Sequence, residues 1–126
     1  MQHTRGARTI LVVDDHDAHR RLLEVVLGAH NYRVVAARDG HEALTYLQSS
    51  TPDAIILDVH MPHMSGFDVA RKVRRVARLC RVPILVMTSS TEHDTIGRAD
   101  EVGASGVIHK PIAGIDLDRR LRALLS

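Results

Sequence analysis

Short continuous runs of apolar residues alternate along the chain with segments in which apolar residues recur every three or four positions. The continuous runs occupy residues 9–13, 32–37, 54–57, 83–87 and 106–108. Runs of this length without polar alternation are typical of strands that are buried on both faces. The pattern therefore predicts five strands, each followed by a helical segment.

Each helical segment is expected to turn one apolar face towards the strands. Asp17 is expected to cap the first helix, and Gly103 to end the fourth. The residues expected on the inner faces are, in chain order, Leu22, Leu23, Val26 and Leu27; Ala43, Leu44 and Leu47; Ala70, Val73 and Ala77; Ile96, Ala99 and Val102; and Leu117, Leu121 and Leu124. Alternating strands and helices predict an α/β domain whose parallel sheet is covered on both faces.

The composition narrows the function classes. The 126 residues suffice for one domain, with 44% hydrophobic and 25% charged residues. Aromatic residues make up only 2% and the formal charge is +2. The core must therefore be aliphatic, and the chain lacks both the aromatic platforms and the strong positive charge that favour nucleic acids. We expect no nucleic-acid binding by this chain alone.

The cysteine content and the chain's start point to a compartment. Cys80 is the one cysteine, which excludes an internal disulfide and is typical of a reducing compartment. No apolar stretch approaches the roughly 20 residues of a membrane span, so no membrane association is expected. Residues 1–8 form a polar leader without the apolar centre of a signal peptide. A cytoplasmic protein is predicted.

Polar residues follow the ends of four of the predicted strands: Asp14 and Asp15, Asp58, Thr88, and Lys110. Ligands of open parallel sheets bind beyond the carboxyl ends of the strands, so these side chains are expected to converge on one edge. Aspartates after strands are also common as helix caps, and any one of these residues alone would indicate little. Their joint placement at separate strand ends favours a site.

The chemistry of this predicted site indicates a metal ion and a phosphoryl group. Each close pair of carboxylates costs about 1 kcal/mol in water and about 4 kcal/mol at an effective dielectric of 20. A divalent cation removes that repulsion, and hard oxygen ligands suit Mg²⁺. Together with a lysine and a hydroxyl, such a metal forms a cradle for a phosphoryl group.

Two other classes of phosphate-handling protein fit the residues less well. A dinucleotide-binding domain needs a glycine-rich turn after the first strand, where this chain has two aspartates, a histidine and a third aspartate. Phosphatases of the haloacid dehalogenase type have a second aspartate two positions after the nucleophile. Here that position, two after Asp58, is His60. A hydrolase acting on small phosphate esters is therefore disfavoured.

From about residue 9 to 125 the chain resembles the bacterial response-regulator receiver family, of the single-domain chemotaxis type. The resemblance is carried by Asp14, Asp15, Asp58, Met61, Pro62, Gly66, Thr88, Lys110 and Pro111. It implies a flavodoxin-like, doubly wound five-stranded parallel sheet in the order 2-1-3-4-5 with five flanking helices, and a receiver domain over residues 9–126. Pro111 is expected to follow a cis peptide bond.

The resemblance also implies a role for each site residue. Asp58 would attack phosphorus and become an aspartyl phosphate. Lys110 would pair with a phosphoryl oxygen and Thr88 would donate a hydrogen bond to another, which moves the following loop and produces the signal. Mg²⁺, with Mn²⁺ as a substitute, would be held by Asp14, Asp15, Asp58 and the backbone carbonyl of His60.

The same resemblance implies partners and a restricted kind of catalysis. The donor would be a sensor histidine kinase or a histidine phosphotransfer protein of a two-component phosphorelay. The output would pass to a downstream protein, or to an output domain outside these 126 residues. The chain would catalyse only its own phosphorylation and autodephosphorylation, so it is not a conventional enzyme.

The chain departs from the family pattern at a few positions. The family usually has an aromatic residue three positions before the lysine, where this chain has Val107, and Ile112 replaces a common phenylalanine. Val107 supports an alternative function, a degenerate receiver that acts as an interaction domain without phosphorylation. Separately, His16, His60 and His63 could bind a softer divalent ion, although solvent-exposed loop histidines are the favoured interpretation.

Overall fold

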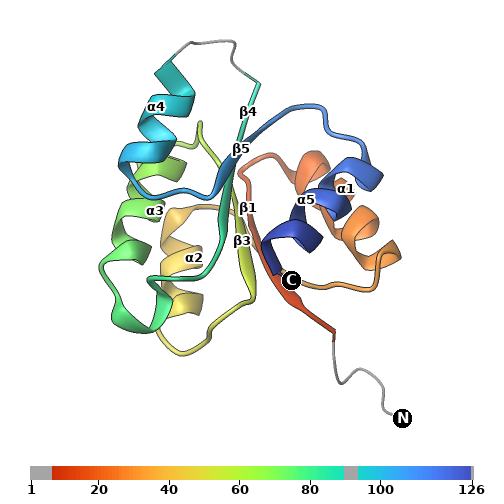
Figure 1. The fold of residues 1–126 in the computed structure, drawn as a ribbon, viewed down its shortest axis with the longest axis horizontal. Coiled ribbons are helices and arrows are strands. Elements are labelled where there is room, and N and C mark those ends of the chain that lie inside the picture. Colours follow the sequence, from red (N-terminus) through yellow and green to blue (C-terminus); the bar gives the residue numbers. More distant parts are fainter. Residues whose placement is uncertain (1–6, 90–93, 126) are drawn as a thin grey trace.

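A computed structural model describes residues 7–89 and 94–125, and within them five strands form one parallel sheet (Figure 1). The strands are β1 (Thr9–Val13), β2 (Arg33–Ala37), β3 (Ala54–Asp58), β4 (Ile84–Thr88) and β5 (Gly106–His109). Their order is β2-β1-β3-β4-β5, and each neighbouring pair is parallel. The predicted doubly wound topology is confirmed.

Helices cover both faces of this sheet. They are α1 (Asp17–Ala29), α2 (Gly40–Leu47), α3 (Gly66–Arg74), α4 (Asp94–Glu101) and α5 (Gly114–Leu125), with a short 3₁₀ helix, η1 (Ala77–Leu79), after α3. In Figure 1, α1 and α5 lie on one side of the sheet and α2, α3 and α4 on the other. None of the described helices is long and apolar enough to cross a membrane.

The inner strands β1, β3 and β4 are buried on both faces, as their unbroken apolar runs predict. The edge strands β2 and β5 were expected to be buried in the same way but are only partly buried, because each has a neighbouring strand on one side only. Leu11 and Val13 of β1 belong to the apolar cluster under α2, α3 and α4, whereas Ile10 and Val12 belong to the cluster under α1 and α5. All four side chains are fully buried. Successive side chains of a strand point to opposite faces, so one short run serves both halves of the core.

The first helix begins differently from the prediction. His16, not Asp17, is the N-cap of α1, and its side chain makes no capping hydrogen bond. Asp17 is the first helical residue and forms an ion pair with Arg20 one turn later. Leu22 was expected on the inner face but is 55% exposed, because the buried stripe of α1 is centred on Leu23 and Leu27.

Two expected inner-face residues of later helices are also exposed. Ala77 does not belong to α3, because that helix ends at Arg74 and the chain turns into η1, which shifts the helical phase. In α4, Ile96 is 60% exposed while its neighbour Thr95 is buried. The buried residues of α4 are Thr95 and Ala99, followed by Val102 directly after the helix, so the inner face is less apolar than the sequence pattern predicts.

The predicted leader falls mainly outside the described residues. Of residues 1–8, the structure describes Ala7 and Arg8, and both are exposed. The first strand, β1, begins at Thr9, and the carbonyl of Arg8 before it accepts a hydrogen bond from the Arg33 N–H of β2 at 2.8 Å.

Candidate functional site

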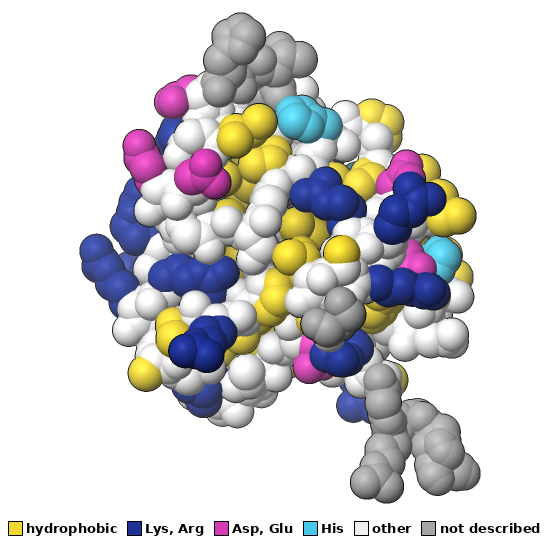
Figure 2. Space-filling view, in the orientation of Figure 1, with side chains coloured by type: hydrophobic (Ala, Val, Ile, Leu, Met, Phe, Trp, Pro, Cys, Tyr) yellow, Lys and Arg dark blue, Asp and Glu magenta, His cyan; other side chains and the backbone are white. Residues whose placement is uncertain are grey.

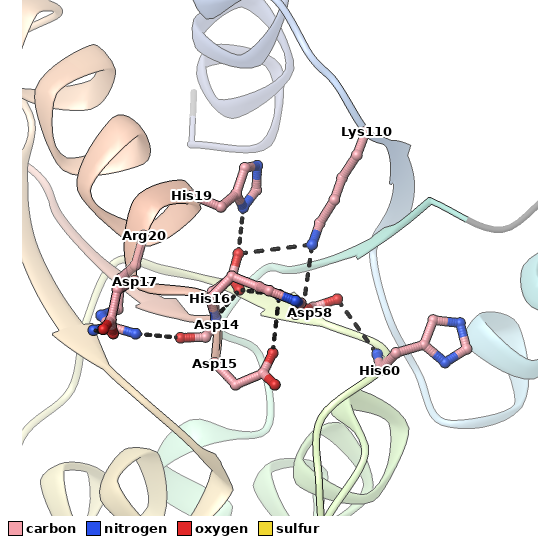
Figure 3. A network of polar contacts seen from close by, with 9 residues as sticks. All are labelled: Asp14, Asp15, His16, Asp17, His19, Arg20, Asp58, His60 and Lys110. Carbon is pink, nitrogen blue, oxygen red and sulfur yellow. Dashed lines mark hydrogen bonds and ion pairs between the residues drawn. The ribbon is translucent and has the colours of Figure 1, made fainter.

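The predicted site residues meet at the carboxyl edge of the sheet (Figure 3). Asp14 and Asp15 follow β1, Asp58 is the last residue of β3, and Lys110 follows β5. Val13 is the register partner of Leu57, so β1 and β3 place Asp14 and Asp58 side by side. Parallel strands end on one edge, and this geometry brings together residues that lie far apart in the sequence.

Asp14 is fully buried and the most extensively bonded carboxylate of the site. Its oxygens form a short contact with the ring Nδ1 of His19, accept a hydrogen bond from the backbone N–H of His16 at 2.9 Å, and lie 3.7 Å from Lys110 Nζ. Burial raises the pKa of this carboxyl, but the hydrogen bonds and the positive charge of Lys110 outweigh it, so that the pKa lies below its ordinary value.

Asp58 is only 2% exposed and has fewer donors. Its Oδ1 accepts a weak hydrogen bond from the backbone N–H of His60 at 3.3 Å, and its Oδ2 lies 3.2 Å from Lys110 Nζ. Burial raises the pKa of this carboxyl, and the negative charge of Asp14 raises it further. Lys110 and the His60 N–H oppose this shift without cancelling it, so the pKa remains above its ordinary value.

Two carboxylate oxygens of the site are left without a hydrogen-bond donor among the described residues. They are Asp15 Oδ1 and Asp58 Oδ2, both buried at the atomic level. Asp58 Oδ2 lies within ion-pair distance of Lys110 but outside hydrogen-bond geometry. Buried polar atoms normally have a partner, so unpaired oxygens beside a third carboxylate fit a divalent cation with oxygen ligands.

Thr88 and Lys110 are positioned by the strands next to Asp58. Asp58 is the register partner of Met87, which places Thr88 one residue further along the same edge, and Thr88 is fully buried. The backbone N–H of Lys110 donates to the carbonyl of Thr88 at 2.9 Å. The bond between Lys110 and Pro111 is cis, as the resemblance implied.

Gly66 holds the loop after β3 against the site. A Cβ at this position would lie 2.4 Å from the backbone oxygen of Asp58, so no side chain fits. The Gly66 N–H donates to the carbonyl of Val59, and Ser65 and Asp68 form a reciprocal capping box at the start of α3. These bonds fix the chain that returns past the acidic edge.

The structure also brings in residues that sequence reasoning missed. His19 contacts the Asp14 carboxylate, and Arg20 donates to the Asp14 backbone oxygen at 2.8 Å. Both lie in the first turn of α1, which begins directly after the acidic pair. When a helix starts directly after a strand, the side chains of its first turn point back towards the end of that strand. The short sequence separation from Asp14 could therefore have identified both residues.

The three candidate histidines separate clearly in the structure. Among the described residues, the one group able to share a metal ion consists of Asp14, Asp15, His16 and Asp58. The side chains of His60 and His63 do not belong to it, and both residues are exposed. The His60 backbone carbonyl stays a predicted ligand.

The chain matches known proteins over nearly its whole length. A family model described as "Response regulator receiver domain" matches residues 10–122. The chain is 37% identical over 117 residues to the transcriptional regulatory protein AfsQ1 of Streptomyces coelicolor, which covers 93% of this chain and 51% of AfsQ1. It is 41% identical over 115 residues to the response regulator PleD of Caulobacter vibrioides, covering 91% of this chain and 25% of PleD.

Solved structures agree with the fold. Chemotaxis protein CheY4 of Vibrio cholerae superposes with a TM-score of 0.91 at 34% identity, over 95% of this chain and 100% of that one. The receiver domain of the Pseudomonas aeruginosa sensor histidine kinase PA1611 superposes with a TM-score of 0.88 at 26% identity, over 95% of this chain and 98% of that one. That structure is described with a magnesium ion coordinated in its active site cleft.

Proposed function

The chain belongs to the response regulator receiver domain family, and on this premise we propose that Asp58 is the acceptor of a phosphoryl group. One observation carries the proposal: a buried carboxylate oxygen of Asp58 accepts no hydrogen bond from the described residues, yet lies 3.2 Å from Lys110 Nζ and beside two further carboxylates. A nucleophilic oxygen placed among charged groups at an open strand edge suits attack on phosphorus.

In the proposed reaction an oxygen of the Asp58 carboxylate forms a bond to phosphorus while the bond from phosphorus to the donor breaks. The donor leaves with the bonding electron pair, and the product is an acyl phosphate on Asp58. Lys110 pairs with a phosphoryl oxygen and offsets its charge, and Thr88 donates a hydrogen bond to another. Water later cleaves the acyl phosphate, so the chain acts on itself rather than on an external substrate.

The residues that would hold Mg²⁺ are Asp14, Asp15, Asp58 and the backbone carbonyl of His60. Their oxygens are the hard ligands this ion prefers, and Mn²⁺ would substitute. When bound, the ion neutralises carboxylate charge and polarises the phosphoryl group.

The proposed partners follow from a two-component phosphorelay. The donor is a sensor histidine kinase or a histidine phosphotransfer protein in the cytoplasm. The chain spans about half of AfsQ1 and a quarter of PleD, so the output is proposed to pass to a downstream protein or to an attached output domain.

No nucleic-acid contact is proposed for these residues themselves. On the face drawn in Figure 2, Lys and Arg side chains are scattered over both helical layers and interspersed with acidic ones. Nucleic-acid-binding domains instead gather positive charge on one face.

The proposal is tested by intact mass after incubation with a small phosphodonor such as acetyl phosphate. We expect one added phosphoryl group in the presence of Mg²⁺, none after chelation, and none in Asp58→Asn. Asp100→Asn, an exposed change on α4, is the matched control and should label like the wild type. Lys110→Ala should impair labelling yet bind Mg²⁺ at least as tightly, because a competing positive charge is gone.

Three results would contradict the assignment. Labelling of Asp58→Asn at the wild-type level would place the acceptor elsewhere. Absence of labelling in the folded wild type would favour the phosphorylation-independent interaction domain that Val107 suggests. Repeated turnover of an external phosphate ester would identify a hydrolase.

A further inference from the structure

We infer, on the basis of the proposed metal-dependent function, that the ring Nδ1 of His16 is an additional metal ligand. The site would then offer one nitrogen and several carboxylate oxygens, and it would favour first-row transition ions such as Co²⁺ and Zn²⁺ over Mg²⁺. Imidazole suits these softer ions, whereas Mg²⁺ prefers oxygen.

The distances around His16 match those of ligands that share one ion. Its Nδ1 lies 3.6 Å from Asp14 Oδ1, 3.3 Å from Asp15 Oδ1 and 4.0 Å from Asp58 Oδ2. Two ligand atoms that are each about 2.1 Å from the same ion lie about 3 to 4.2 Å apart, depending on the angle between them. All three distances fall in this range.

The unpaired oxygens supply a second, independent observation. Asp15 Oδ1 and Asp58 Oδ2 are two of the atoms that approach the His16 ring, and they are the buried oxygens without a hydrogen-bond donor among the described residues. In Figure 3 the His16 ring extends over these carboxylates, whereas the His60 ring points away from them. The imidazole ring and the unpaired oxygens thus point towards the same position, where they could share one metal ion.

The His16 side chain is available for this role. It is 68% exposed, and although His16 is the N-cap of α1 its side chain makes no capping hydrogen bond. Its backbone N–H donates to Asp14 Oδ1, which ties the residue to the acidic edge. Metal ligation by Nδ1 would therefore break no helix cap, and the ring needs little movement.

The same contacts suit a simpler role, in which a protonated His16 only offsets the carboxylate charge. The two roles differ in their effect on metal binding. A ligand increases affinity for ions that accept nitrogen, whereas a positive counter-charge decreases affinity for every divalent cation. Removing the ring therefore separates them.

Isothermal titration calorimetry of the full chain with Mg²⁺ and with Co²⁺ tests the inference. His16→Ala is suitable because it removes the ring without removing a capping bond. We expect this change to weaken Co²⁺ binding about tenfold or more, and Mg²⁺ binding by less than about twofold. His41→Ala, which removes an exposed histidine on α2, is the control and should change neither affinity.

A second measurement reads the ligand atom directly. With Zn²⁺, the ring nitrogens of His16 are observed by histidine-selective ¹⁵N NMR, and Nδ1 rather than Nε2 should carry the shift typical of a bound metal. A Zn²⁺-induced shift confined to other histidines would overturn the inference.

The outcomes for His16 and for the proposed function are distinguishable. Suppose that Mg²⁺ and Co²⁺ both bind and that Asp58→Asn weakens both. If His16→Ala then lowers the two affinities equally, raises both or changes neither, His16 is not a ligand and the proposed phosphoacceptor site stands. If the wild type binds neither ion, or if Asp58→Asn leaves binding unchanged, the metal site of the proposed function fails as well.

Discussion

Two neighbouring aspartates of the site have pKa values shifted in opposite directions. Both are buried, and burial raises the pKa of each carboxyl. Asp14 gains enough from His19, the His16 N–H and Lys110 to end below its ordinary value, whereas Asp58 does not and ends above it. Asp58, whose negative charge is the less well stabilised of the two, is the residue proposed to react. Binding a cation offsets that charge, and forming a bond to phosphorus removes it from the carboxylate.

The raised pKa of Asp58 predicts how the metal-free domain responds to pH. Between the ordinary value of 3.8 and the raised one, the native state binds more protons at Asp58 than the unfolded state. The Asp58 contribution to the free energy of unfolding therefore falls as pH rises through this window. Asp58→Asn removes the buried charge and should stabilise the domain by about 1–2 kcal/mol at pH 7 in chelator.

Urea unfolding at several pH values checks this prediction. The increase in the free energy of unfolding caused by Asp58→Asn should disappear at pH values where Asp58 of the wild type is protonated. It should become smaller when Mg²⁺ is added. Asp14 provides the opposite sign: its lowered pKa gives stability that is present above 3.8 and lost as pH falls through the lowered value. A stabilising Asp14→Asn at pH 7, or a destabilising Asp58→Asn, would contradict the account.

The sequence predicted which side chains gather at the strand ends, but it did not predict the environment of each one. Asp14, Asp15, Asp58, Thr88 and Lys110 could be found because unbroken apolar runs reveal where each strand stops. Their pKa directions could not, because these depend on which donors reach each oxygen.

Among the elements, α3 is constrained most closely by the site. Its first residue, Gly66, lies against the backbone oxygen of Asp58, and backbone cannot move aside as a flexible side chain can. The start of α3 and the end of β3 are thus packed without space for a methyl group.

Gly66→Ala should therefore destabilise the domain by about 1–3 kcal/mol through overpacking. Gly28→Ala is the matched control, since Gly28 lies in α1 and a methyl group there would meet no neighbouring atom within 4 Å. That change should stabilise by about 0.5–1 kcal/mol because alanine favours a helix. Urea unfolding of both variants measures the contrast; equal effects of the two changes would refute the packing argument.

At the scale of the whole molecule, the proposed phosphorylation of Asp58 would act on the rest of the sheet through Thr88. Thr88 ends β4, and Val107 lies in the neighbouring strand β5, where its register partner is Val86. Val107 is half-buried and packs against the apolar cluster that includes Ala99 of α4. The family resemblance places an aromatic side chain at position 107. Valine is shorter and has few rotamers, so we predict that space vacated by Thr88 is poorly refilled.

Poor refilling would make the phosphorylated state incompletely populated. Moving a two-state equilibrium from 1:99 to 99:1 needs about 5.5 kcal/mol of differential stabilisation, and weak packing reduces that difference. NMR spectra with beryllium fluoride as phosphate mimic should show averaged peak positions for residues of β4 and β5, and Val107→Tyr should move them towards one end state. Complete displacement in the wild type, unchanged by Val107→Tyr, would contradict this prediction.

The sequence by itself determined the strands, the two-sided burial of β1, β3 and β4, and the edge at which the candidate site residues meet. Unbroken apolar runs between helical segments allow few arrangements other than a doubly wound parallel sheet, and such a sheet has its ligand site at the strand ends.

Only the tertiary structure decided how each side chain is used. Leu22 and Ile96 face outward because packing sets which side of each helix is buried. Sequence periodicity alone locates that side only to within about one residue. His16 approaches the carboxylates while His60 and His63 do not, because the path of each loop, and not spacing along the chain, places the imidazole rings. Burial and donor geometry depend on atoms contributed by several elements at once, and these exist only when the chain is folded.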